Sequence, residues 1–95
     1  MYVLIGRLEL YMPENQSLKE KRMIIKSISE KLKKRFSCSI AEVDYQEKWQ
    51  RAVLGVALVS GDFTYLNQSE DNMIRFIEET YDLDVISAEF EIIKK

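Results

Sequence analysis

The stretch AVLGVALV, residues 52–59, decides the fold of this 95-residue chain. It is apolar along its whole length, so neither of its two side-chain faces is suited to contact with water. A strand of this kind is typical of the centre of a sheet, or of a sheet with both faces covered. The sequence therefore predicts a sheet with residues 51–60 as a central strand.

The segments around this stretch predict three more strands. Residues 36–45 form one, and the short connection 46–50 favours an antiparallel hairpin with residues 51–60. Residues 2–12 alternate with a period of two and end at Pro13, which cannot donate to a ladder. Residues 83–93 alternate in the same way. In that last strand we expect four side chains to face the core and four to face outward: Ile86, Ala88, Phe90 and Ile92 inward, and Val85, Ser87, Glu89 and Glu91 outward.

Two helices are predicted between the strands. Ser17 and Glu20 have the spacing of a capping box, and an apolar stripe at helical spacing predicts a helix from about residue 18 to 35. The members of this stripe are Leu18, Ile25, Ile28, Leu32 and Phe36. Asp62 is placed to cap a second helix, whose weaker stripe consists of Phe63, Leu66, Met73, Ile74 and Ile77.

The resulting order is β-α-β-β-α-β. Over residues 1–95 it predicts a single α+β domain, the ferredoxin-like sandwich, in which two helices cover one face of a four-stranded antiparallel sheet. In that arrangement the first and third strands are central, which agrees with the apolar third strand. Because this fold serves many unrelated functions, the function has to be argued from particular residues.

Composition excludes several classes of function. The chain has no histidine, which removes the Ser–His dyad and most catalytic zinc sites. Cys38 is the only cysteine, so no intrachain disulfide can form, and we expect it to be a small buried hydrophobic residue. No apolar run is long enough to span a bilayer, and the first residues lack the features of a secretion signal. We expect a cytoplasmic protein with no membrane association, catalytic site, bound metal or cofactor.

Positive charge concentrates in the first predicted helix. Residues 17–36 carry eight basic residues against two acidic ones, a net charge of +6. On a helical wheel four of them fall within about 60° of one another, away from the apolar stripe: Lys19, Arg22, Lys26 and Lys33. Such a row suits a phosphate backbone. The commoner alternative is a solvated face, with the cations of the last turn complementing the helix dipole.

The second half of the chain has the opposite sign. Residues 62–91 carry nine acidic residues against Arg75 alone, a net charge of −8. Glu78 and Glu79 lie near the end of the second helix, where the helix dipole disfavours negative charge. Either a partner compensates these charges, or the fold tolerates their small energetic cost unaided. The net charge of −2 for the whole chain therefore hides a polarised molecule.

The hairpin segment, residues 41–51, has the most unusual composition. Glu42 and Asp44 are two residues apart, which predicts that they share one face of a strand. Paired carboxylates can bind a divalent cation or act as acid and base. We favour a structural interpretation, in which Arg51 pairs with Glu42 or Asp44 and Trp49 packs over a helix end.

Two stretches together resemble the YlxP-like family of small bacterial proteins. They are SLKEKR, residues 17–22, and AEVDYQ, residues 41–46, which runs into WQRAVLGV, residues 49–56. The resemblance covers essentially the whole chain and implies a ferredoxin-like fold in a cytoplasmic protein. It also implies a link to translation, because genes of the family often lie beside those for ribosome maturation and initiation factors. It implies no catalytic residue and no role for the matching residues, which are Ser17, Leu18, Lys19, Lys21, Arg22, Glu42, Asp44, Gln46, Trp49, Gln50 and Arg51.

These observations predict a non-enzymatic protein that associates with RNA or the ribosome through its basic helix. The expected RNA contacts are Lys19, Arg22, Lys26, Lys33 and Lys34, with Lys48, Trp49 and Arg51 at the hairpin end. The alternative is a dimeric module for protein interaction or ligand sensing. It would use the open face of the sheet, where the first strand presents Val3, Ile5 and Tyr11.

Overall fold

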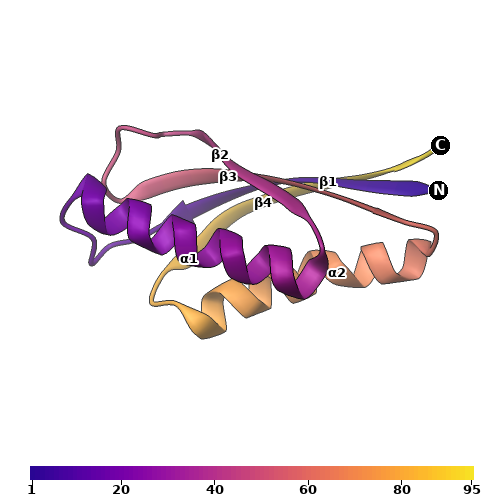
Figure 1. The fold of residues 1–95 in the computed structure, drawn as a ribbon. Helices are drawn as coiled ribbons and strands as arrows, with labels where there is room; N and C mark the ends of the chain where they lie inside the picture. Colours follow the sequence, from indigo (N-terminus) through magenta and orange to yellow (C-terminus); the bar gives the residue numbers. More distant parts are fainter.

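The computed structural model describes residues 1–95 and confirms the predicted order of elements (Figure 1). Four strands and two helices follow one another as β1 (Tyr2–Tyr11), α1 (Leu18–Phe36), β2 (Ser39–Asp44), β3 (Arg51–Ser60), α2 (Phe63–Thr80) and β4 (Asp84–Lys94). Neither helix combines the length and the apolar character needed to cross a membrane.

The strands form one antiparallel sheet in the order β2-β3-β1-β4. The two central strands are β1 and β3, as the doubly apolar stretch in β3 predicts. Both helices lie side by side on one face of the sheet and leave the other face open (Figure 1). The chain ends meet at one end of the sheet, where the N-terminal amine donates to the Lys95 carbonyl at 2.9 Å. This is the ferredoxin-like α+β sandwich expected from the sequence.

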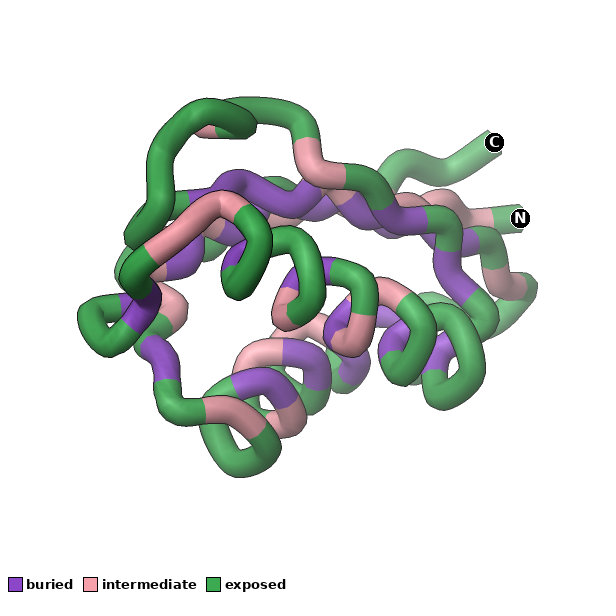
Figure 2. Tube along the Cα trace, turned by 60° about the vertical axis from the view of Figure 1, so that its left-hand side comes forward, coloured by how far each residue is buried: buried purple, intermediate pink, exposed green.

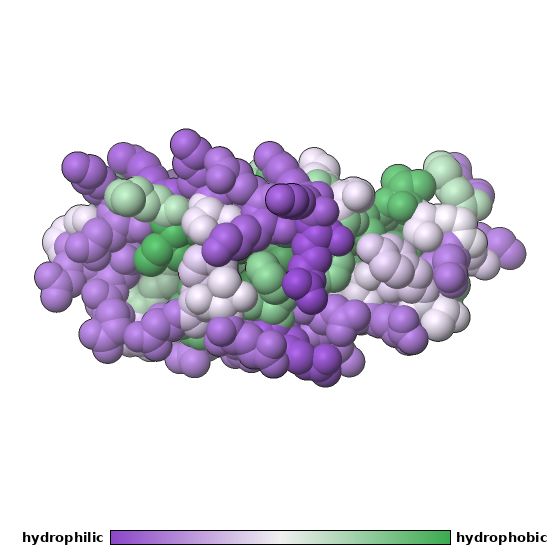
Figure 3. Space-filling model, turned by 60° about the horizontal axis from the view of Figure 1, so that its bottom comes forward, coloured by the Kyte–Doolittle hydropathy of each residue, from purple (hydrophilic) through white to green (hydrophobic).

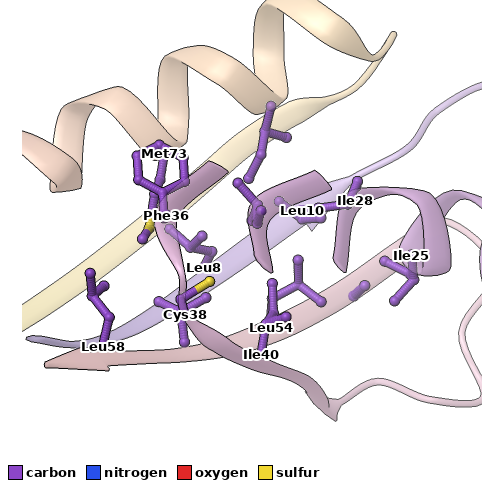
Figure 4. Close-up of a cluster of buried hydrophobic side chains, with 14 of the residues drawn as sticks. Leu8, Leu10, Ile25, Ile28, Phe36, Cys38, Ile40, Leu54, Leu58 and Met73 are labelled. Carbon is purple, nitrogen blue, oxygen red and sulfur yellow. The ribbon is translucent and has the colours of Figure 1, made fainter. Parts of the chain in front are cut away.

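The core lies between the sheet and the helices (Figure 4). It is one cluster of 18 buried residues, to which β1 and β3 contribute the alternate positions that face the helices. The apolar stripe of α1 packs onto them through Ile25, Ile28, Leu32 and Phe36. Cys38 belongs to the same cluster, so the prediction that it is a buried hydrophobic residue is confirmed.

The first helix begins and ends close to the predicted positions. Ser17 is the N-cap, and its Oγ accepts the Glu20 amide at 3.1 Å, while the Glu20 carboxylate accepts the Gln16 amide rather than that of Ser17. At the other end Ser37 adopts the left-handed conformation with φ of 54°, which stops the helix after Phe36. The strand predicted from residue 36 therefore starts only at Ser39.

The last strand departs from simple alternation. Its pairing with β1 shifts between Glu9 and Leu10, so that Leu10 pairs with Val85 instead of Ile86. Val85 packs against the core, and Ile86 is 46% exposed. The orientations predicted for these two residues are wrong because a bulge inserts one residue and reverses the faces on one side of it. Beyond the bulge Phe90 and Ile92 pack against the core as predicted, whereas Ala88 remains exposed at the sheet edge.

Candidate functional site

Lys21 is the most deeply buried charged residue in the chain. It lies in the first turns of α1, on the side that faces the sheet, and none of its side chain is exposed. Its Nζ donates to the carbonyl oxygens of Tyr45 at 2.7 Å, Gln46 at 3.2 Å and Arg51 at 3.1 Å. The ammonium group therefore binds the backbone at both ends of the β2–β3 connection.

The charge of Lys21 is balanced by Glu42. Glu42 Oε2 lies 2.9 Å from Lys21 Nζ, and only 17% of the Glu42 side chain is exposed. This buried oxygen accepts no hydrogen bond, so the ammonium charge is its compensation. Removing one member of a buried ion pair typically costs about 3–5 kcal/mol, because the other charge is left without a partner. Lys21 and Glu42 therefore depend on each other.

The connection between β2 and β3, residues 45–50, is held from a second side by the turn that precedes α1. We call this connection the hairpin platform. Asn15 Nδ2 donates to the Trp49 carbonyl at 2.8 Å, and the Met12 amide donates to the Gln50 carbonyl at 2.8 Å. In return, Gln50 Nε2 donates to the carbonyls of Pro13 and Asn15 at 3.0 and 3.3 Å. Although the platform is exposed (Figure 2), its backbone is fixed by buried polar groups.

The two hairpin carboxylates do not share a face. The β2–β3 pairing shifts between Glu42 and Asp44, so a bulge at Val43 turns Glu42 toward α1 and Asp44 toward the open face. Asp44 Oδ2 lies 3.6 Å from Arg7 Nη2, and its Oδ1 accepts the Tyr45 amide at 2.8 Å. The prediction of a shared face is wrong. Because the two carboxylates point to opposite faces, they cannot bind one cation between them.

The partner predicted for Arg51 is also wrong. Arg51 Nη1 binds Glu9 Oε2 of β1 at 2.8 Å, because both side chains lie on the same face of adjacent strands. Glu42 pairs instead with Lys21, and Asp44 with Arg7. Trp49 is 55% exposed and lies beside Lys48, Gln50 and Arg51 on the protein surface. An exposed tryptophan on a fixed backbone is unusual for a purely structural residue.

Sequence reasoning missed the role of Lys21, although a signal was present. The apolar stripe of α1 has a gap between Leu18 and Ile25. Lys21 fills that gap, because it lies three residues after Leu18 and four residues before Ile25, on the same face of the helix. A lysine in an apolar stripe has to find buried partners. Four of the residues for which the family resemblance implies no role are structural: Ser17 caps α1, and Lys21, Glu42 and Gln50 hold the platform. Gln46 contributes its backbone carbonyl, while its side chain is exposed.

The predicted basic row on α1 is present. Lys19, Arg22, Lys26 and Lys33 are all exposed, and none of them has a carboxylate within ion-pair distance. At about 100° and 1.5 Å per residue, they form a row about 21 Å long on one flank of the helix. Lys34 is exposed as well but lies about 100° further round the helix, outside the row.

On the opposite flank of α1, two cations contact aromatic rings of the same chain. Lys31 Nζ lies 5.2 Å from the Tyr81 ring centroid, and the Arg35 guanidinium lies 4.9 Å from that of Phe76. Ser27 Oγ and the Tyr81 hydroxyl are hydrogen-bonded at 2.7 Å. Figure 3 shows hydrophilic side chains along the helices and paler, more apolar atoms in the band between them. The basic row is consequently the flank of α1 that faces away from α2.

The residues predicted to contact RNA separate into two groups on two faces of the protein. The basic row lies on the helix side of the sheet. Lys48, Trp49 and Arg51 instead line a cavity of about 490 Å³ with Tyr11 and Gln50. Tyr11 and Arg51 pair across β1 and β3 at positions that alternate with buried core residues, so they face the open side. The two groups form two surfaces rather than one.

The open face of the sheet carries exposed apolar side chains from every strand: Ile5 of β1, Val43 of β2, Val59 of β3, and Ile86 and Ile93 of β4.

Part of the negative charge in the second half of the chain has a structural role within the protein, because Glu78 Oε2 accepts the Val85 amide at 3.1 Å. One of the two carboxylates that the helix dipole disfavours is thus used to hold the start of β4.

The only thiol is poorly suited to chemistry. Burial raises the pKa of Cys38 above its ordinary value of 9.0, against smaller opposing effects of a backbone hydrogen bond and of the Lys33 charge. A thiol in this state is a weak nucleophile at neutral pH.

Comparison with known proteins agrees with the family resemblance. The pattern of the family described as "Protein of unknown function (DUF503)" matches residues 3–90. The chain is also 37% identical, over 62 residues, to the uncharacterized protein YlxP of Bacillus subtilis (strain 168). That alignment covers 65% of this chain and 67% of the relative. The segments that match the family include the α1 start and the hairpin, which the Lys21 contacts join in space. The chain belongs to the DUF503 family of YlxP-like proteins.

Proposed function

We propose that this protein is a non-enzymatic, cytoplasmic RNA-binding accessory factor of the ribosome that docks through the basic row of α1. The observation that carries the proposal is the row itself: four exposed cations on one flank with no internal partner. The chain uses Lys21, Lys31 and Arg35 of the same helix internally, so the row and the neighbouring Lys34 are what remain available to a phosphate backbone.

The charges around the row favour an anion. Glu30 is the one carboxylate that borders the row on α1, and it forms no ion pair. Glu20 is occupied at the start of the helix by the Gln16 amide. The length of about 21 Å spans several phosphates of an RNA strand.

The test is filter binding of ribosomal RNA across a salt series. We expect log K to fall with log[salt] with a slope of about −3, the value for four neutralised phosphates. Reversal of two row charges, in Lys26→Glu/Lys33→Glu, is expected to weaken binding and make the slope shallower by about 1.5.

A matched control is Lys94→Glu/Lys95→Glu, which changes the net charge equally at exposed positions outside the row. It is expected to leave the slope nearly unchanged. Equal effects of the two double variants would show that only net charge matters, and would contradict docking through the row.

A second candidate function is a homodimer that covers the open face of the sheet. The observation that favours it is the set of exposed apolar side chains there, including Ile5 and Val59 on neighbouring central strands. A twofold dimer through this face would shield them, and the same face would serve for protein interaction or ligand sensing.

Sedimentation velocity tests the dimer. We expect concentration-dependent association that Ile5→Glu or Val59→Glu abolishes, because a charge in an apolar interface is strongly disfavoured. Met23→Glu is the control, since Met23 is exposed on the helix side. A protein that stays monomeric at every concentration would overturn this second candidate.

A further inference from the structure

We propose that the cavity between Tyr11, Trp49 and Arg51 binds one unpaired RNA base, stacked on the Trp49 indole. This inference rests on the proposed RNA-binding function and adds a second site, on the face of the sheet opposite the basic row. The cavity is an open depression of about 490 Å³ in the protein surface, a shape that suits stacking on an exposed ring rather than enclosure of a ligand.

The walls of the cavity have the chemistry of a stacking site. Trp49 and Tyr11 supply aromatic faces, and the Arg51 guanidinium lies 5.8 Å from the Tyr11 ring centroid. Glu9 holds that guanidinium at 2.8 Å, so its plane is restrained. Lys48, on the rim, has no carboxylate partner within ion-pair distance. Flat aromatic faces beside a planar cation match a nucleobase, and a free ammonium group matches the attached phosphate.

The hairpin platform keeps this site preorganised. The carbonyl of Trp49 accepts from Asn15, the Gln50 carbonyl accepts from Met12, and the Arg51 carbonyl accepts from Lys21. Three consecutive residues are thus held by three different partners while the indole remains 55% exposed. A rigid backbone beneath an exposed aromatic residue lowers the conformational entropy lost on binding.

The local charge distinguishes this site from the basic row. Glu9 pairs with Arg51, and Asp84 lies directly opposite Tyr11 on the neighbouring strand, so the two cations at the cavity, Arg51 and Lys48, are matched in number by two carboxylates. The cavity is therefore close to neutral, and its affinity has to come mainly from stacking. We expect binding there to depend weakly on salt, whereas binding to the row depends on it strongly.

Because Trp49 is the only tryptophan, its fluorescence reports directly on the cavity. The experiment titrates the full chain with short single-stranded oligoadenylate and, separately, with a fully paired RNA duplex. We expect the single strand to quench Trp49 over a wide salt range and the duplex to leave it unchanged. By anisotropy of labelled oligoadenylate, Trp49→Ala is expected to bind roughly tenfold more weakly, while Trp49→Phe retains most of the affinity.

The outcomes distinguish the cavity site from the basic row wherever RNA binds at all. RNA binding that depends on the row but neither quenches Trp49 nor responds to Trp49→Ala overturns the cavity site and leaves the row in place. Quenching that survives Lys26→Glu/Lys33→Glu supports the cavity, even if the row fails its own test. No binding of any RNA overturns both. A fluorescence change that follows protein concentration alone assigns Trp49 to a contact between copies and overturns the base site.

Discussion

Lys21 and Lys26 lie on the same helix, five residues apart, and are used in opposite ways. Lys21 faces the sheet, is fully buried, and is bound to Glu42 and three backbone carbonyls. Lys26 lies on the outer flank, is exposed, and has no partner within the protein. The +6 charge of residues 17–36 is therefore not one feature. Part of it holds the fold together, and part of it is available for binding.

The energetic meaning of the two positions differs accordingly. A buried ammonium group is desolvated, so its contacts must all be present for the fold to tolerate it. An exposed one keeps its hydration, so its loss changes little in the unbound protein. Substitutions on the two sides should therefore separate stability from RNA binding.

The largest effect is expected for Lys21→Met. This change leaves Glu42 and three carbonyls without their shared partner, and we expect the free energy of unfolding to fall by about 3–5 kcal/mol. Urea denaturation followed by circular dichroism measures it. The control is Lys19→Met on the same helix. A change of more than about 0.5 kcal/mol in its free energy of unfolding would contradict the statement that the exposed lysines of α1 do not hold the fold together.

A smaller loss is expected for Glu42→Gln. The neutral amide keeps the shape of the carboxylate but removes the charge that balances Lys21, which we expect to destabilise the protein by about 1–3 kcal/mol. The same denaturation experiment applies. Asp44→Asn is the control, because Asp44 lies exposed on the other face in a pair with Arg7. An equally large loss in the free energy of unfolding for Asp44→Asn would show that burial of the carboxylate does not decide how much it stabilises the protein.

The outer flank should tolerate neutralisation. For Lys26→Met/Lys33→Met we expect a change in the free energy of unfolding within about 0.5 kcal/mol, since lysine and methionine have similar helix propensities. The RNA affinity of the same variant should fall in the filter-binding assay. A loss of stability with unchanged RNA binding would contradict the role proposed for the basic row, because it would make these lysines part of the fold and not of the RNA contact.

The smallest effect at neutral pH concerns Cys38, which follows α1 into the core. Burial raises its pKa, so the folded state keeps the thiol proton at a pH where the unfolded chain has lost it. Its contribution to stability is complete below about pH 9 and is lost as the pH rises further. We therefore expect a steeper fall of stability above pH 9 for the wild type than for Cys38→Ala. Parallel curves would show that the thiol has the same pKa in both states.

Most of the fold could be predicted, because its signals are local. The apolar run at residues 52–59, the Ser17 cap and the alternation of residues 2–12 each report directly on a strand or a helix. The side-chain orientations that were predicted wrongly lie at the two bulges, in β4 opposite Glu9 and in β2 after Glu42. A bulge adds one residue to one of two paired strands, so it depends on the partner strand and is not visible in alternation alone.

The candidate site could be predicted only in part. The basic row follows from helical spacing, because every member lies on one element. The split of the predicted RNA contacts between two faces could not be predicted, since it depends on which way β3 presents Arg51. The same holds for the exposed position of Trp49, whose backbone carbonyl is held by the turn that precedes α1.

Periodicity, capping and charge in the chain alone established the order of elements, the central position of β3 and the presence of a basic helix flank. These properties arise within single elements, where neighbouring residues settle the conformation. Packing of the elements decided that Lys21 is a buried anchor, that Glu42 and Asp44 face opposite ways, and that Trp49 stands exposed on a rigid platform. Each of these depends on groups distant in the sequence, and burial converts such contacts from weak surface interactions into requirements of the fold.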